Sequence, residues 1–220
     1  MVGFVLFHML GNLQMFQGPD AINTYAHFLK TLPPAVMWGG RLFLLAAAGV
    51  HVATAISLTR ENCKACPTDP GVKERVQATL SSKTMALSGS ILLFFIVFHI
   101  LHFTTHTIFP VYKTFMTDLD GQQVYDVYSM VIYGFSNAWI ATFYIIAMGL
   151  LCMHLSHGVS SMFQSLGLRN NYWRKTFDIF AALYGWVIFI GFVSNPAAVL
   201  LSEYTSLNIF PVQDVLLRLS

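Results

Sequence analysis

Four histidines lie one by one in four different apolar stretches of the chain: His8, His51, His99 and His154. An imidazole is costly to place in hydrocarbon, so histidines at such positions usually bind a ligand or hydrogen-bond to a partner. Imidazole nitrogen is a common metal ligand, and two histidines on facing helices can bind one metal ion from opposite sides. One histidine on each of four helices is therefore the arrangement needed to hold two flat metal cofactors inside a bundle.

The composition indicates that lipid surrounds these stretches. Of the 220 residues, 55% are hydrophobic and 10% are charged, and the mean hydropathy is +0.61. Ordinary soluble domains contain about 25% charged residues, so a soluble core could not absorb this much apolar surface. The net charge of +2 gives no reason to expect a nucleic-acid partner, and three irregularly spaced cysteines predict no disulfide framework.

Five apolar stretches predict an all-α integral membrane bundle of five transmembrane helices, formed by one domain over residues 1–220. They cover residues 1–16, 35–59, 84–109, 136–160 and 177–201. A helix needs about 20 residues to cross a bilayer, so four stretches are long enough and the first is too short. The first stretch also lacks the basic start and small-residue end of a signal peptide. We therefore expect a further N-terminal segment before it.

The basic residues between the spans predict the orientation. One group of connecting segments holds eight of them and the opposite group holds Lys30, Arg41, Lys113 and Arg218. The richer group faces the cytoplasm by the positive-inside rule, which places the N-terminus inside and the C-terminus outside. Its members are Arg60, Lys64, Lys73, Arg75, Lys83, Arg169, Arg174 and Lys175.

The orientation gives each histidine a depth. His51 lies nine residues before Arg60, which is about 14 Å at helical rise, and His154 lies at a similar height above the other inner segment. His8 and His99 lie in the outer halves of their spans. The depths therefore pair His51 with His154 and His8 with His99, and predict two bis-histidine hemes, one above the other.

Each histidine taken alone has a simpler interpretation, because lone intramembrane histidines also form helix–helix hydrogen bonds or relay protons. Two pairs matched in depth on four helices are much harder to produce by chance. Small residues near the ligands would leave room for a macrocycle, although they are also frequent in ordinary transmembrane packing. They are Gly11, Ala46 to Gly49, Gly89, Gly149 and Gly158.

Several segments together resemble a known family. These are the run Phe7-His8-Met9-Leu10-Gly11-Asn12-Leu13-Gln14, the run Tyr25-Ala26-His27-Phe28-Leu29, Ser88-Gly89 with His99 ten residues after the glycine, and His154 four residues before Gly158. Over nearly the whole chain, the sequence resembles the diheme cytochrome b subunit that anchors succinate:quinone oxidoreductases and quinol:fumarate reductases. Family members of this type start about one helix length earlier.

The resemblance implies cofactors and partners. It implies that His51 and His154 bind the iron of an inner heme b, and that His8 and His99 bind the iron of an outer one. It also implies a flavoprotein subunit with covalent FAD and an iron–sulfur subunit on the cytoplasmic face of a bacterial inner membrane. Electrons would pass between the iron–sulfur subunit and a membrane quinone. The resemblance to diheme members of the family favours menaquinone as this quinone.

Polar groups near the predicted outer heme are candidates for contact with a quinone oxygen or a heme propionate. Arg41 could serve this role or extend to the outer headgroups, and His27 in the outer segment could simply face solvent. His102 shares a helix face with His99 and competes with it for the ligand role; we favour His99 because of its spacing from Gly89. The candidates are Asn12, Gln14, His27, Arg41, His102 and His106.

Three features leave parts of the prediction open. His157 competes with His154, which the Gly158 spacing favours. Cys152 and Met153 stand where some family members have a glutamate that assists proton movement. Cys63 and Cys66 form a C-x-x-C followed by Pro67 rather than the histidine of a c-type heme site. A diheme anchor of a hydrogenase or formate dehydrogenase, and a heme-free transporter that relays protons through histidines, are the alternatives.

Overall fold

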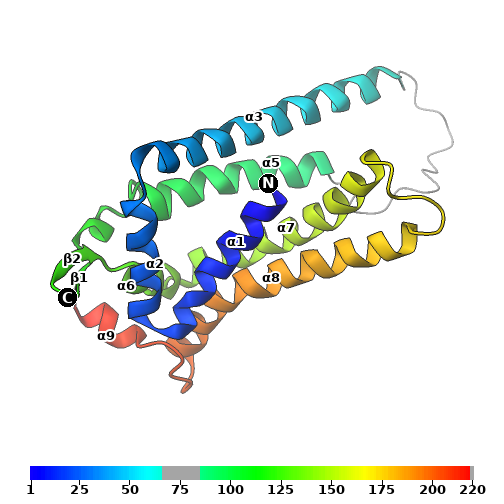
Figure 1. Cartoon of the computed structure of the whole chain (residues 1–220). Helices are drawn as coiled ribbons and strands as arrows, with labels where there is room; N and C mark the ends of the chain where they lie inside the picture. Colours follow the sequence, from blue (N-terminus) through cyan, green and yellow to red (C-terminus); the bar gives the residue numbers. More distant parts are fainter. Residues whose placement is uncertain (66–84, 219–220) are drawn as a thin grey trace.

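The computed structural model describes residues 1–65 and 85–218, except the side chains of Asn62, Cys63 and Ala65. Four of its helices are long and apolar enough to cross a membrane. The multi-pass prediction is therefore confirmed for four spans. They run side by side in Figure 1. They are α3 (Pro34–Ala65), α5 (Met85–His99) with its π-helical continuation η2 (Ile100–Thr104), α7 (Ala138–Ser165) and α8 (Arg174–Tyr204).

The first predicted span forms the short helix α1 (Val2–Asn12) and the 3-10 turn η1 (Leu13–Gln17). Together they fall short of the roughly 20 residues that a full crossing needs, so the structure does not show a fifth span. Two hydrogen bonds fix this segment on α8. The Tyr184 hydroxyl donates to Val2 O at 2.7 Å, and Asn195 Nδ2 donates to Asn12 O at 2.9 Å.

Short elements gather at one end of the spans, and we call them the cap. The all-α prediction needs one correction here, because the cap contains a two-stranded antiparallel hairpin with Met116 opposite Tyr125. Asp120 and Gly121 form its turn with φ of 53° and 81°, as expected for an Asp-Gly type I′ turn. The cap consists of α2 (Pro19–Thr31), η3 (Pro110–Thr114), β1 (Met116–Leu119), β2 (Gln122–Tyr125), α6 (Val127–Ser136) and α9 (Val212–Leu217).

Buried polar side chains hold the cap together. Asp126 caps α6 by accepting from the backbone N–H of Ser129 at 3.1 Å, and Asn23 of α2 donates to the same carboxylate at 3.1 Å. The Asn23 amide oxygen accepts from the N–H of Tyr128. Because each of these polar groups is paired, they can be buried without the cost of a lost hydrogen bond.

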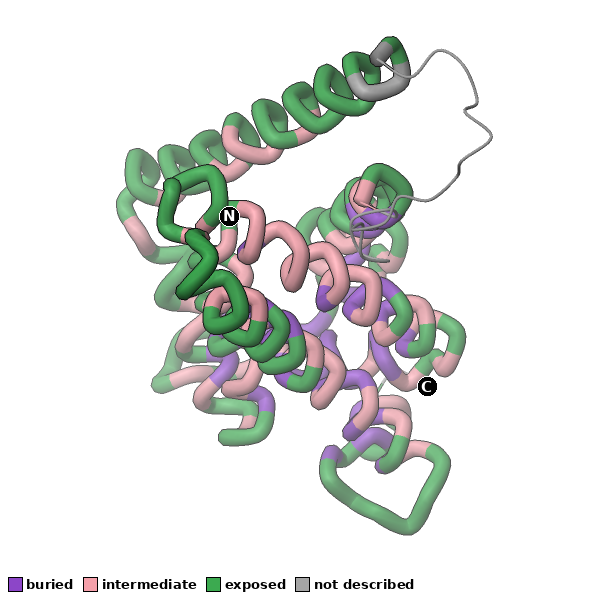
Figure 2. Tube along the Cα trace, turned by 90° about the vertical axis from the view of Figure 1, so that its right-hand side faces the viewer, coloured by how far each residue is buried: buried purple, intermediate pink, exposed green. Residues whose placement is uncertain are grey.

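The hydrophobic core lies where the cap meets the adjacent ends of α5, α7 and α8. Ile132 of α6 and Ala141 of α7 are both fully buried, and the buried segments in Figure 2 lie in the part of the bundle away from α3. Farther along, α7 and α8 remain close: a Cβ on Gly185 would lie 2.8 Å from the backbone oxygen of Cys152. These three helices and the cap form one continuous packed body.

Helix α3 differs from the rest of the bundle. None of its membrane-spanning window is buried, and Figure 2 shows the helix exposed or half-exposed along its length. The half-exposed residues among its described side chains lie on the face that also carries His51; they are Met37, Leu44, Ala47, Ala48 and Val52. This face, although little covered, is the one directed toward the bundle.

Candidate functional site

The four intramembrane histidines come together as two pairs. The rings of His8 and His99 have centroids 5.8 Å apart, and those of His51 and His154 have centroids 6.1 Å apart. In both pairs the ring planes are 78° apart. We call them the outer pair and the inner pair, after the predicted orientation. These are the two pairs that the depth argument predicted, whereas their binding of iron stays a prediction.

The ring separations suit two imidazoles that share one metal ion. A metal–imidazole nitrogen bond is about 2 Å long, so two opposed ligands would place their ring centres about 6 Å apart. Among the described residues, no group of three or more His, Cys, Asp or Glu side chains is placed to hold a metal ion. A pair supplies only two donors, which fits a metal whose remaining positions are filled by a planar macrocycle.

In the inner pair, Ser88 of α5 orients the His154 ring. The Ser88 hydroxyl lies 3.2 Å from His154 Nδ1 and donates its own proton to Met85 O at 3.2 Å. Since that proton is engaged, Ser88 Oγ is left to accept from an N–H at Nδ1. This assigns the proton of His154 to Nδ1 and leaves Nε2 free as a ligand, the usual arrangement of metal-binding histidines.

In the outer pair, Tyr144 of α7 takes the corresponding place beside His99. Its hydroxyl lies 3.3 Å from His99 Nδ1, so Nε2 of His99 has no hydrogen-bond partner among the described residues. Phe95 and Phe103 also contact the His99 ring, with centroids 6.0 Å away in each case. Contacts from its own helix and from α7 therefore fix the direction of this imidazole.

His8 lies half-buried between aromatic side chains. Phe4 stacks on it at 5.5 Å, and Phe192 of α8 lies 5.7 Å away. Asn12 donates to His8 O at 2.7 Å, and the same amide nitrogen is 3.5 Å from His8 Nε2. Asn195, which binds the backbone of Asn12, has the one buried side-chain oxygen without a hydrogen-bond partner in the described part of the chain.

His51 has a more open environment than the other three. Among the described side chains of α3, His51 alone has a ring contact or a hydrogen bond with another helix, and that contact is with His154. Hydrogen bonds of Thr54 and Thr59 return to the backbone of α3 itself. The sequence therefore brings α3 to the bundle at the histidine and leaves the flanking surface uncovered.

His102 is the intramembrane histidine whose environment the sequence did not reveal. It is fully buried, with Nδ1 2.9 Å from the Tyr144 hydroxyl and Nε2 2.7 Å from the Tyr112 hydroxyl. Both nitrogens are occupied, so no ring nitrogen is free for a metal. Burial raises the pKa of Tyr112, and nearby Tyr133 adds to this effect, which keeps the Tyr112 phenol protonated. The π-helical turn η2 carries His102 into this position.

Gly89 lies at a different pair from the one expected. The sequence suggested that it makes room beside His99, but a Cβ on Gly89 would lie 3.3 Å from Cε1 of His154. Ser88 and Gly89 therefore both face the inner pair. The physical reason is that they lie near the start of α5, about three turns before His99, at the level of the inner part of α7.

The remaining candidates for contact with a quinone or a heme propionate lie at separate places and, within the described residues, have no hydrogen bond or ring contact with either histidine pair. Gln14 is half-buried in η1, and Arg41 lies over the ring of Trp38 at 5.1 Å. His27 lines a shallow surface depression between α2 and the hairpin. His106 donates from Nε2 to Phe103 O at 3.2 Å; burial lowers its pKa, an effect that this bond opposes and that Lys30 and Lys113 reinforce.

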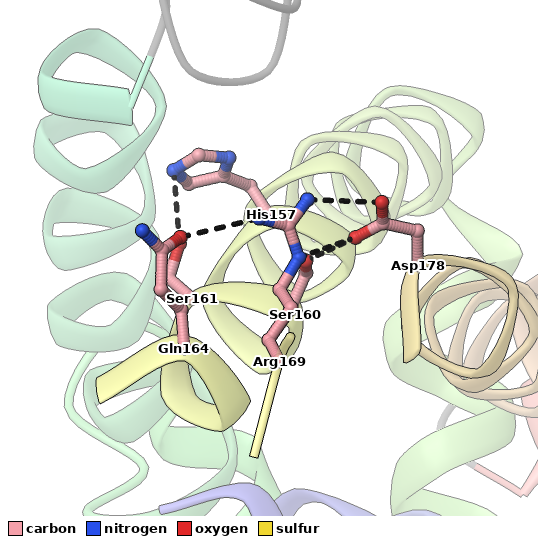
Figure 3. Close-up of polar contacts among 6 residues, drawn as sticks. All are labelled: His157, Ser160, Ser161, Gln164, Arg169 and Asp178. Carbon is pink, nitrogen blue, oxygen red and sulfur yellow. Dashed lines mark hydrogen bonds and ion pairs between the residues drawn. The ribbon is translucent and has the colours of Figure 1, made fainter. Parts of the chain in front are cut away.

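The opposite end of the spans contains a separate polar cluster, drawn in Figure 3. Arg169 donates to Asp178 through Nε at 3.1 Å and through Nη2 at 2.9 Å, while the Ser160 hydroxyl donates to the same carboxylate. His157 pairs with Ser161 of its own helix at 3.3 Å. The cluster joins α7 to the start of α8, and in the described part of the chain His157 has no hydrogen bond or ring contact with either histidine pair.

The predicted inner basic surface is described only in part. Arg169, Arg174 and Lys175 line a shallow depression with Asp178, Ile179 and Ala182. Lys73, Arg75 and Lys83, together with Cys66 of the cysteine pair, lie outside the described residues.

Comparisons with protein-family models, curated proteins and solved structures find no match to this chain.

Proposed function

We propose that this chain is the diheme cytochrome b membrane subunit of a succinate:quinone oxidoreductase or quinol:fumarate reductase. The observation that supports this most strongly is the presence of two histidine pairs, each with a ring separation of about 6 Å, the spacing that two imidazoles on one metal require. The directed Nδ1 contacts of His99 and His154 add support, because each leaves Nε2 free.

The fold gives the two pairs a suitable arrangement for carrying electrons through a membrane. Tyr144 contacts His99, and His154 follows ten residues later on the same helix. The pairs are therefore about 15 Å apart along α7. When bound, two b hemes would supply one-electron transfer, with potentials set by the axial histidines and their surroundings. The chain itself would hold the ligands in place, with aromatic side chains packed against both histidines of the outer pair.

The quinone, which we propose to be menaquinone, would bind near the outer pair. Asn12 lies next to His8, and Asn195, which donates to Asn12 O, has a buried oxygen without a hydrogen-bond partner among the described residues. A quinol hydroxyl could donate to such an oxygen. Gln14, His27, Arg41 and His106 are farther candidates on the same side. The flavoprotein with FAD and the iron–sulfur subunit would dock at the opposite, basic end, on the cytoplasmic side of a bacterial membrane.

A visible spectrum of the purified chain tests the proposal. We expect Soret and α bands and about two hemes per chain, since each histidine pair would bind one. His51→Ala and His154→Ala should each remove one heme, whereas the matched variant His157→Ala should leave both, because His157 contacts neither pair. A preparation made with heme available that still lacks a Soret band would contradict the heme assignment.

Co-purification tests the partner. We expect a flavoprotein and an iron–sulfur protein to accompany the chain, with succinate oxidation or fumarate reduction coupled to a quinone. A diheme preparation that brings a hydrogenase or a formate dehydrogenase instead would keep the cofactors and overturn the assignment of the complex.

A further inference from the structure

A chain of four polar side chains leads away from the outer pair into the cap. His99 Nδ1 lies 3.3 Å from the Tyr144 hydroxyl, which lies 2.9 Å from His102 Nδ1. His102 Nε2 then lies 2.7 Å from the Tyr112 hydroxyl. His102 and Tyr112 are at most 1% exposed. Three elements supply the four groups: α5 with its π-helical end, α7 and η3.

Ligation at one end would give every hydrogen bond in this chain a direction. If His99 binds a metal through Nε2, its proton lies on Nδ1 and is donated to the oxygen of Tyr144. Tyr144 then has its own O–H left to donate, and the adjacent acceptor is Nδ1 of His102. His102 in turn carries its proton on Nε2 and donates it to the Tyr112 oxygen. Each neutral histidine thus has one donor and one acceptor nitrogen, as its chemistry requires.

We propose that Tyr144 and His102 are positioning residues that act on the outer heme through His99. They hold the His99 ring in one tautomer and orientation, and they make it a stronger electron donor to the metal. The proposal rests on the proposed function, because it requires that His99 binds a heme iron.

The physical basis is the acceptor that a ligating imidazole meets at its second nitrogen. An acceptor at Nδ1–H raises the basicity of the ligand, which stabilises the oxidised metal and lowers the reduction potential. Tyr144 is a better acceptor when its own proton is donated onward, because hydrogen bonds in a chain polarise one another. His102 is therefore the group that makes Tyr144 a stronger hydrogen-bond acceptor for His99, although His102 itself does not bind the metal.

The inner pair lacks this device. The acceptor at His154 Nδ1 is the Ser88 hydroxyl, which donates to the backbone oxygen of Met85. The contact ends there, within one turn of α5. A change at Tyr144 or His102 is therefore expected to act on one heme and to leave the other unaffected.

Potentiometric titration of the purified diheme protein tests the proposal. The outer heme is first identified as the one that His8→Ala removes. Tyr144→Phe keeps the buried ring and removes the hydroxyl, so we expect both hemes to remain, the midpoint potential of the outer heme to rise, and that of the inner heme to stay unchanged. Tyr133→Phe is the matched control: its ring also contacts Tyr112 but no histidine, and it should shift neither potential.

Two substitutions at His102 separate a hydrogen-bond effect from a packing effect. His102→Phe fills the space with a ring that cannot accept from Tyr144, and should raise the outer potential by less than Tyr144→Phe does. His102→Asn places an amide oxygen close to the former Nδ1 position and should return the potential toward that of the unaltered protein. These two His102 variants also test the proposal if Tyr144→Phe fails to retain the outer heme.

Two results would overturn the proposal: an unchanged outer potential in Tyr144→Phe with both hemes bound, or equal shifts in His102→Phe and His102→Asn. Failure of the proposed function gives a different result, because the unaltered protein would then lack the heme bands altogether.

Discussion

At the outer pair, His99 lies among Phe95, Phe103 and Tyr144, whereas at the inner pair His51 projects from a helix that packs closely on no other element of the described chain. The ring separations differ by only a few tenths of an ångström, and the ring planes are 78° apart in both. Similar pair geometry is thus reached in two contrasting environments.

The comparison indicates that different interactions fix the two pairs. Aromatic side chains surround the outer pair: the buried Phe95 and Tyr144 lie against His99, and Phe4 and Phe192 lie against His8. Packing therefore fixes much of its geometry. The inner pair depends on the direction of α3 and on two small side chains of α5, Ser88 and Gly89, next to His154. If the proposed function holds, a heme bound between His51 and His154 would link α3 to the bundle where direct helix contacts are few.

The largest difference between the two pairs is expected from a substitution at Gly89. A Cβ there would already lie 3.3 Å from His154 Cε1, and the γ-carbons of Gly89→Val would force the ring out of line with His51. We expect loss of the inner heme and retention of the outer one, which heme quantification and redox titration would measure.

Gly49→Val is the matched control for this substitution. Gly49 lies on α3 with nothing within 4 Å of its Cβ position, on the side of the helix away from His51. This variant should keep both hemes. Loss of the same heme in both variants would contradict a specific role for Gly89.

Some of this arrangement could be predicted from the sequence and some could not. The pairing of His51 with His154 follows from counting residues from the basic segments, because helical rise converts sequence position into depth. The role of His102 could not be found in that way. It depends on Tyr112, which is ten residues away and beyond the end of the helix, and on Tyr144 in another helix.

Spacing along the chain also misplaced Gly89, which it linked to His99 but which lies beside His154, since spacing along one helix does not show which neighbouring helix a residue faces. The hairpin, by contrast, could have been predicted from Asp120-Gly121, a dipeptide that favours a tight turn between two short strands. The sequence pattern therefore predicted four of the spans and the two histidine pairs, while the contacts between elements depend on packing that the sequence pattern does not show.

A second, smaller effect tests the packed end directly. Ile132 of α6 is fully buried in the core between the cap and the spans, and replacing such a side chain with alanine typically costs about 2–5 kcal/mol. Ile132→Ala should therefore lower the unfolding temperature in detergent clearly. Ile56→Ala removes the same atoms from α3, where Ile56 is 47% exposed, and should change it little. Equal losses from the two variants would show that α3 is as firmly packed as the cap.

The smallest expected effect concerns the hydrogen bond that orients His154. Ser88→Ala removes the acceptor 3.2 Å from Nδ1, and loss of such an outer-shell partner typically weakens metal binding by about tenfold or more. The inner heme should then pass to an excess of a heme-accepting protein about ten times faster, while the outer heme transfers at its original rate. Ser90→Ala is the matched control, because the Ser90 hydroxyl donates only to Ala86 O in its own helix. Among the described residues, Ser88 is the one side chain with a hydrogen bond to His154. Equal transfer rates in these two variants would therefore mean that the inner pair is oriented by its cofactor alone.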